Sequence, residues 1–203
     1  MPGKHVEKLA VFLNIPYDDK FSNLYLAYIV AVSSFGFLPK ATLLIPGHRR
    51  LDRISELIDS SAFSIHDLSR VELDRNYPST PRFNMSFELG LAVARASINS
   101  AHRWFVMEAV NRRALKSLSD LNGTDVYIHN GRIDGVMREI CNMFLSSEAQ
   151  PTVPEMMRTY RQLRLSVPGI LRKAGSSSIY SARAFSDISV AAAVLVRKHR
   201  DQR

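Results

Sequence analysis

Seven polar residues stand where an apolar run ends or a helical segment opens, and their types suit binding and acid–base chemistry. They are Asn14, Tyr17, Asp18, Asp67, Ser69, Asn84 and Glu88. Two carboxylates that lie close together can divide acid and base work, because like charges raise the pKa of one of them. We therefore take Glu88 and Asp67 as candidate catalytic residues and the other five as candidate ligand-binding residues.

Apolar runs and helical spacings alternate around these residues. Strands are predicted at residues 9–15, 41–45, 62–68, 104–110 and 126–129. Helices are predicted at residues 21–35, 51–58, 83–96, 114–118 and 133–145, and a polar loop at 72–82. This alternation predicts a parallel five-stranded α/β sheet with helices on both faces. In the order 2-1-3-4-5, the carboxyl ends of the first and third strands flank the usual ligand crevice.

Three segments, FLNIPYDDKF, SIHDLSR and RFNMSFELGLAVA, resemble the nucleoside 2-deoxyribosyltransferase-like and TIR-like proteins. The resemblance covers residues 8–145 in topology and implies a flavodoxin-like sheet. It also implies that Asp67 is the aspartate at the end of the third strand and Glu88 the glutamate of the ELG run. The chain departs from the transferases at residues 82–85. The transferases usually have an extra aspartate and a short glycine-rich segment just before the glutamate, whereas this chain has RFNM. That departure counts against a deoxyribosyl substrate more than against the fold.

The resemblance implies an enzyme that hydrolyses or transfers at an N-glycosidic bond, with Glu88 as the nucleophile or essential carboxylate. Its substrate would be a nucleoside, a nucleotide or NAD, with no further cofactor required. It also implies self-association into a homo-oligomer and a setting such as prokaryotic antiviral defence or signalling. The alternative is a module of the same fold that binds a nucleotide signal without breaking it. Catalysis requires an ionisable group at Glu88, whereas binding alone would tolerate glutamine there.

Several of these residues also have structural explanations. Asp18 suits a helix N-cap, Asp67 could cap a turn, and Asn84 is a good N-cap with Glu88 one position beyond a capping box. Adjacent residues of a strand point to opposite faces, so we assign His66 the structural role beside Asp67. His129 either belongs to the turn that Asn-Gly predicts or reaches the crevice from a neighbouring strand end.

The remaining sequence signals exclude several classes of protein. The chain has 203 residues, 46% of them hydrophobic, and a single cysteine, Cys141, so no internal disulfide can form. The six histidines lack metal-ligand spacing, and GxGxxG, GxxxxGK[ST] and GxSxG motifs are absent, so we expect no metal site. The longest apolar runs, such as residues 24–32, are too short to span a bilayer. We expect a cytoplasmic protein without a membrane segment.

The net charge of +8 is distributed unevenly. Residues 1–150 carry 17 basic and 16 acidic side chains, whereas residues 151–203 carry 10 and 3. We divide the chain into a nucleotide-binding domain at 1–147 and a basic helical extension at 148–203, with helices at 156–165 and 185–199 that pack on the sheet domain or on a partner subunit. The stripe Arg158, Arg161 and Arg164 is either a surface for nucleic acid or an acidic partner, or a solvated outer face. We favour the solvated face, because few aromatic residues interleave with the arginines.

Overall fold

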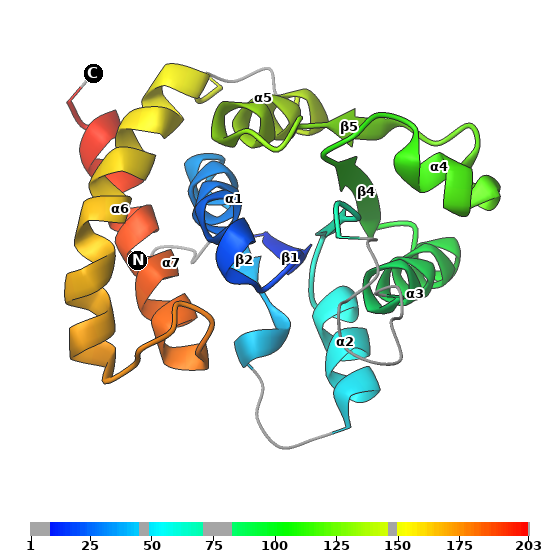
Figure 1. Ribbon diagram of the computed structural model, residues 1–203, viewed down its shortest axis with the longest axis horizontal. Coiled ribbons are helices and arrows are strands. Elements are labelled where there is room, and N and C mark those ends of the chain that lie inside the picture. The colour runs from blue at the N-terminus through cyan, green and yellow to red at the C-terminus, as the bar shows by residue number, and fades with distance from the viewer. Residues whose placement is uncertain (1–8, 45–48, 71–82, 146–149, 203) are drawn as a thin grey trace, which may run out of the picture.

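The computed structural model describes residues 9–44, 49–70, 83–145 and 150–202 (Figure 1). Its strands are β1 (Ala10–Asn14), β2 (Leu38–Lys40), β3 (Phe63–Asp67), β4 (Arg103–Glu108) and β5 (Val126–Ile128). All neighbouring strands are parallel, and they lie in the order β2-β1-β3-β4-β5. The predicted flavodoxin-like sheet and its strand order are therefore confirmed. The predicted loop at residues 72–82 lies outside the described residues.

Helices cover both faces of the sheet. On one face lie α1 (Ser22–Ser34) and α5 (Ile133–Met143), and on the other lie α2 (Arg50–Asp59) and α3 (Asn84–Ile98) (Figure 1). Short elements complete the connections: η1 (Asp19–Phe21), η2 (Thr42–Leu44), α4 (Arg113–Ser117) and η3 (Ser119–Leu121). All five residues of β1 are buried, as expected for a central parallel strand covered on both faces.

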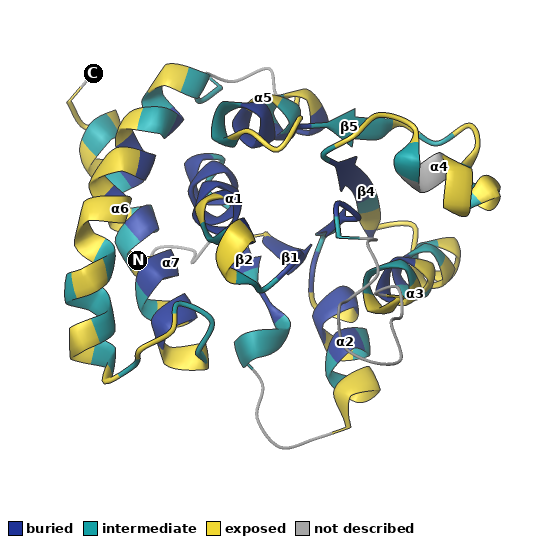
Figure 2. Cartoon of the chain, in the orientation of Figure 1, coloured by how far each residue is buried: buried dark blue, intermediate teal, exposed yellow. Residues whose placement is uncertain are grey.

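Helix α1 is buried on every side. Each residue from Leu24 to Ser34 is at most 9% exposed, and Figure 2 shows this helix in dark blue inside the molecule. An all-round apolar helix requires cover on the side that faces away from the sheet. The C-terminal helices α6 (Val153–Ala174) and α7 (Ala182–Arg200) provide that cover.

The two C-terminal helices form an antiparallel hairpin that joins the core of the sheet domain. Leu163 of α6 and Ile188 of α7 have no exposed surface and belong to the same apolar cluster as α1. Polar contacts reinforce this packing, since the Tyr160 hydroxyl donates to Asn23 Oδ1 at 3.2 Å and the Tyr25 hydroxyl donates to the Ile179 carbonyl at 3.1 Å. Helices α6 and α7 of the predicted extension, residues 148–203, therefore pack on the sheet domain within one chain.

Two predicted elements differ from the structure. The predicted strand at 41–45 is wrong: the second strand is β2, Leu38–Lys40, and Thr42–Leu44 form a 3-10 turn. Pro39 is tolerated in β2 because this strand lies at the edge of the sheet, where a missing N–H breaks no ladder. The predicted helix at 156–165 is too short, since α6 begins with a Thr152–Glu155 capping box and continues past Pro168 to a left-handed cap at Gly175.

Candidate functional site

Glu88 is a buried carboxylate near the carboxyl edge of the sheet. Its side chain is 4% exposed, and its Oε1 accepts a hydrogen bond from Arg50 Nη2 at 3.2 Å. Burial raises the pKa of Glu88, and the hydrogen bond and charge of Arg50 oppose that rise. The Arg50 side chain is 61% exposed, so the pair joins a buried acid on α3 to a solvent-facing cation at the start of α2. A poised acid of this kind can serve as a nucleophile or an acid–base group.

Tyr17 lies within the electrostatic range of Glu88. Burial raises the pKa of Tyr17 to about 12, with a further contribution from the Glu88 charge, so the phenol stays protonated at neutral pH. Its hydroxyl donates to the Leu13 carbonyl at 3.4 Å, and no described contact joins it to the Glu88 carboxylate. Its ring packs against Tyr25 and Tyr180, with centroid distances of 6.1 and 5.9 Å. The ring is therefore part of a tyrosine cluster between α1 and the C-terminal hairpin.

Asn14 fixes the first turn of α3 against the sheet. Its Nδ2 lies 2.9 Å from His66 Nδ1 and donates to the Met85 carbonyl at 3.2 Å. An amide nitrogen only donates, so His66 Nδ1 accepts and its Nε2 carries the proton. His66 Nε2 lies 2.9 Å from the Ser64 hydroxyl, which lies 3.0 Å from His102 Nε2. Asn14 thus holds the first turn of the helix that carries Glu88. It is itself held by the buried hydrogen-bonded chain of His66, Ser64 and His102.

His66 has the structural role that its position in the strand predicted. It has no exposed surface, and burial, with a smaller contribution from His102, lowers the pKa of His66 to about 3. A neutral imidazole satisfies both of its hydrogen bonds, so His66 joins β1 to β3 without carrying charge.

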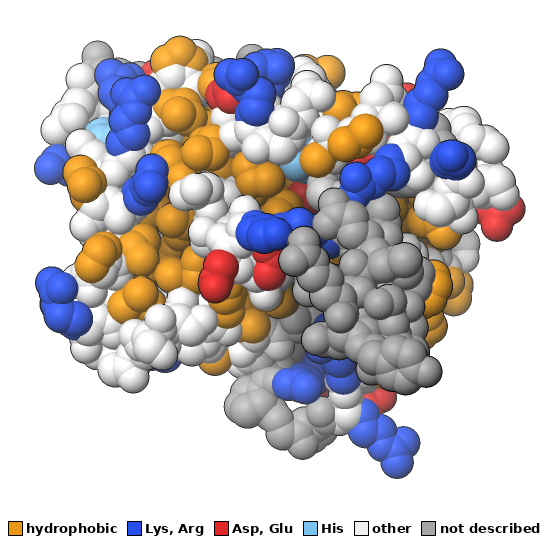
Figure 3. Space-filling model, in the orientation of Figure 1, with side chains coloured by type: hydrophobic (Ala, Val, Ile, Leu, Met, Phe, Trp, Pro, Cys, Tyr) orange, Lys and Arg blue, Asp and Glu red, His pale blue; other side chains and the backbone are white. Residues whose placement is uncertain are grey.

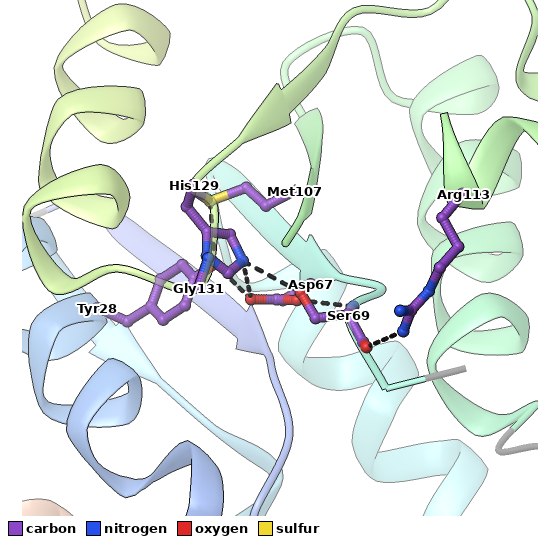
Figure 4. A network of polar contacts seen from close by, with 7 residues as sticks. All are labelled: Tyr28, Asp67, Ser69, Met107, Arg113, His129 and Gly131. Atoms are coloured by element: carbon purple, nitrogen blue, oxygen red, sulfur yellow. Dashed lines mark hydrogen bonds and ion pairs between the residues drawn. The ribbon is translucent and has the colours of Figure 1, made fainter. Parts of the chain in front are cut away.

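Asp67 lies in a second polar group, on the side of the sheet that faces α1 (Figure 4). Its Oδ2 accepts from the Tyr28 hydroxyl at 2.7 Å and lies 3.1 Å from His129 Nε2, and its Oδ1 accepts from the Ser69 N–H at 2.9 Å. The Asp67 side chain has no exposed surface. Burial, followed by the charge of Asp67, raises the pKa of Tyr28 well above its usual value. Asp67 is therefore a fully engaged carboxylate within the core.

His129 belongs to the turn that the sequence predicted, and its ring is buried in the core beside Asp67. Asn130 and Gly131 have positive φ angles of 56° and 66° and form the predicted turn, while the His129 ring points inward and has no exposed surface. The Gly131 N–H donates to His129 Nδ1 at 3.1 Å, so the ring proton is on Nε2 and is directed to Asp67. A glycine is required at position 135, because a Cβ there would lie 2.1 Å from the His129 carbonyl oxygen.

The Asp67, His129 and Ser69 side chains do not form a nucleophilic triad. The Ser69 hydroxyl lies 3.1 Å from His129 Nε2, the same nitrogen that contacts Asp67. A triad requires the serine and the carboxylate on different ring nitrogens, with the nitrogen beside the serine free to accept a proton. Arg113 also donates to the Ser69 carbonyl at 2.7 Å, so Ser69 is held through its N–H, its carbonyl and its hydroxyl (Figure 4).

Asp18 acts as the cap that its position predicted. Its Oδ1 accepts from the Phe21 N–H at 3.1 Å at the start of η1, and it forms an ion pair with Arg70 Nη2 at 2.8 Å. Asn84 differs from the expectation, since it is the first residue of α3 rather than its cap, and it is exposed. The α3 N-cap is Phe83, which makes no side-chain capping bond.

The two candidate catalytic residues, Glu88 and Asp67, lie on opposite faces of the sheet. Glu88 contacts Arg50 of α2, whereas Asp67 contacts Tyr28 of α1 on the other side of the sheet. The raised pKa of Glu88 comes from its burial, and Asp67 makes no contribution to it. Sequence reasoning did not single out Arg50. The available signal was an arginine at the first residue of the helix that precedes the third strand.

In the described ranges 9–44, 49–70, 83–145 and 150–202, no three His, Cys, Asp or Glu side chains gather as metal ligands would. None of the helices in those same ranges is both long enough and apolar enough to cross a bilayer. The chain matches no protein-family model, no curated protein and no solved structure.

Proposed function

We propose that this protein is an enzyme that cleaves N-glycosidic bonds, with Glu88 as its catalytic carboxylate. The observation that carries the proposal is the burial of Glu88 near the carboxyl edge of a flavodoxin-like sheet, where burial raises the pKa of Glu88. Ligands of open α/β sheets bind at this edge. The ligand would be a nucleoside, a nucleotide or NAD, and no additional cofactor would be needed.

The chemistry uses the Glu88 carboxylate beside the anomeric carbon. As the C1′–N bond breaks, its electron pair leaves with the base and positive charge develops on the ribose ring. The carboxylate stabilises that charge or bonds to C1′, and water or an acceptor hydroxyl then completes hydrolysis or transfer. Arg50 must release Glu88 Oε1 in this step, and its high exposure leaves it free to turn towards solvent or a ligand anion.

The other candidate residues support this site from two sides. Asn14 holds the first turn of α3, and Tyr17 presents a protonated phenol near the Glu88 charge. We retain Asp67 as a positioning residue, because its carboxylate is fully buried and orders Ser69 through the Ser69 N–H. Asn84 is exposed at the start of α3, where it would contact a bound ligand. Asp18, which lies between β1 and η1, would also contact the bound ligand.

Incubation of purified protein with NAD, nucleoside monophosphates and deoxynucleosides, followed by chromatography of the released base, tests the proposal. Glu88→Gln keeps the shape of the side chain and removes its charge, so we expect at least a hundredfold loss of turnover. Glu56→Gln, an exposed carboxylate on α2, is the control and should leave turnover unchanged. Turnover that survives in the Glu88 variant would refute the assignment.

The ion pair between Arg50 and Glu88 favours a second candidate, a nucleotide-binding module without catalysis. A carboxylate already engaged by a cation is less available as a nucleophile. Calorimetry in which ligand binds and is recovered intact, with equal affinity in the Glu88→Gln variant, would support the module over the enzyme.

The wider setting also remains a proposal. On the resemblance of its motifs, we infer a homo-oligomer in the cytoplasm that takes part in prokaryotic antiviral defence or signalling. Size-exclusion chromatography with light scattering, with and without ligand, tests the self-association.

A further inference from the structure

The arginines of α6 form an exposed stripe on the side opposite the core. Arg158, Arg161 and Arg164 are all exposed, whereas Met156, Tyr160 and Leu163 are buried. Residues three apart on a helix differ by about 60° around the axis, so the three arginines span about 120°. Along the axis they extend over about 9 Å. The stripe therefore presents three cations within a short and continuous surface.

Two cations of α7 lie at the same end of the hairpin. The Thr159 hydroxyl lies 2.9 Å from His199 Nδ1, which places the N-terminal half of α6 beside the C-terminus of α7. Arg197 and Lys198 precede His199 and are exposed. Arg197 lies on the other side of α7, beside Pro39 and Leu44, so we call Arg158, Arg161, Arg164 and Lys198 the basic end. Figure 3 shows basic side chains gathered at the upper left, over the region where α6 begins and α7 ends.

The cations of the basic end differ from those elsewhere in their pairing. Within residues 9–44, 49–70, 83–145 and 150–202, none of these four residues forms an ion pair. Arg50, Arg70, Arg95, Arg132 and Arg138, by contrast, each contact a carboxylate. Of the nearby acids, Glu155 accepts the Thr152 N–H in the α6 capping box, and Asp201 is exposed after α7. The basic end thus presents exposed cations that form no ion pair with the described residues.

We propose that the basic end binds double-stranded nucleic acid through its phosphate backbone. Three of the four cations are arginines, whose planar guanidinium groups fit phosphate oxygens in pairs. Single-stranded nucleic acid requires exposed aromatic rings for stacking. In residues 150–202, Tyr160 and Phe185 are buried and Tyr180 packs against Tyr25. Backbone contact without base reading is the mode that this surface supports.

Fluorescence anisotropy with a labelled 20-base-pair duplex, as DNA and as RNA, tests this surface. We expect binding at 50 mM NaCl that weakens steeply as salt increases. The triple variant Arg158→Gln/Arg161→Gln/Arg164→Gln should weaken binding at least about tenfold and reduce the salt slope by about 2–3, because each phosphate contact contributes about 0.9. The control Arg95→Gln/Arg132→Gln/Arg138→Gln removes the same charge from exposed, paired arginines and should bind nearly as the parent does.

Three results would overturn the proposal. They are equal weakening in the two triple variants, tighter binding to a single strand than to the duplex, and binding to phosphatidylserine vesicles without binding to either duplex. Circular dichroism checks that both variants are folded. This test involves neither Glu88 nor base release. Its failure would therefore not refute the proposed cleavage activity, and a failure of that activity would not refute nucleic-acid binding.

Discussion

Replacing Tyr28 with phenylalanine removes one oxygen from the core and measures how strongly Asp67 depends on its donors. The Tyr28 ring would keep its packing against Phe21, but the 2.7 Å hydrogen bond to Asp67 Oδ2 would be lost. Two donors, the Ser69 N–H and His129 Nε2–H, would remain on the buried carboxylate. The change therefore removes the bond to a charged acceptor and a 3.1 Å contact with the neutral Met107 Sδ, without opening a large cavity.

The size of the effect follows from the charge on the acceptor. Hydrogen bonds to charged groups contribute about 1.5–3 kcal/mol, whereas bonds between neutral groups contribute about 1 kcal/mol. Tyr160→Phe is the matched control, because the Tyr160 side chain is also buried and its hydroxyl donates to the neutral Asn23 Oδ1. We expect Tyr28→Phe to cost about 1.5–3 kcal/mol and Tyr160→Phe about 1 kcal/mol.

Urea unfolding followed by circular dichroism measures both costs as changes in the free energy of unfolding. At about 2–4 °C per kcal/mol for a chain of this size, Tyr28→Phe should lower the melting temperature by about 3–12 °C. In an Asp67→Asn background the cost of Tyr28→Phe should shrink, since the charged acceptor is absent. A cost no greater than that of Tyr160→Phe, or an undiminished cost in that background, would refute the description of Asp67 as a buried charged acceptor.

Two further predictions concern the pH response and the C-terminal helices. His66 has a pKa near 3 when folded and near 6.5 when unfolded, so the unfolded chain takes up its proton first and stability falls as the pH drops through this window. The slope contributed is about 1.4 kcal/mol per pH unit, and urea unfolding at pH 4–7 should show a shallower dependence in His66→Gln. Leu163→Ala, in the buried face of α6, should cost about 2–5 kcal/mol, whereas Leu165→Ala, 83% exposed, should cost under about 0.5 kcal/mol. Equal costs for the two leucines would show that α6 does not share the core.

The fold was predictable because its strands are apolar and its helices follow them in regular alternation. The edge strand was not predictable, because its residues, Leu38-Pro39-Lys40, include a proline and a lysine. The strand was predicted instead at the neighbouring apolar run, residues 41–45. The length of α6 was also missed. A proline normally ends a helix, but Pro168 is exposed and α6 continues past it to Ala174.

The sequence predicted the elements on which the candidate residues lie, but not the side chains that these residues contact. Sequence placed Asp67 and Glu88 at the correct edge of the sheet, yet the direction of each side chain depends on its packing. Asp67 turns towards α1 because Tyr28 and His129 supply donors there, and both come from distant parts of the chain. The partner of Glu88 is Arg50, 38 residues away, and no local pattern links the two.

The sheet is longest at its centre and shortest at its margins. β1, β3 and β4 have 5, 5 and 6 residues, whereas the edge strands β2 and β5 have 3 each. Short edges, one of them interrupted by Pro39, offer few free backbone donors to an incoming strand and so resist aggregation by edge-to-edge templating. Any assembly of this protein with its own copies would therefore use helical surfaces and leave the sheet margins unpaired.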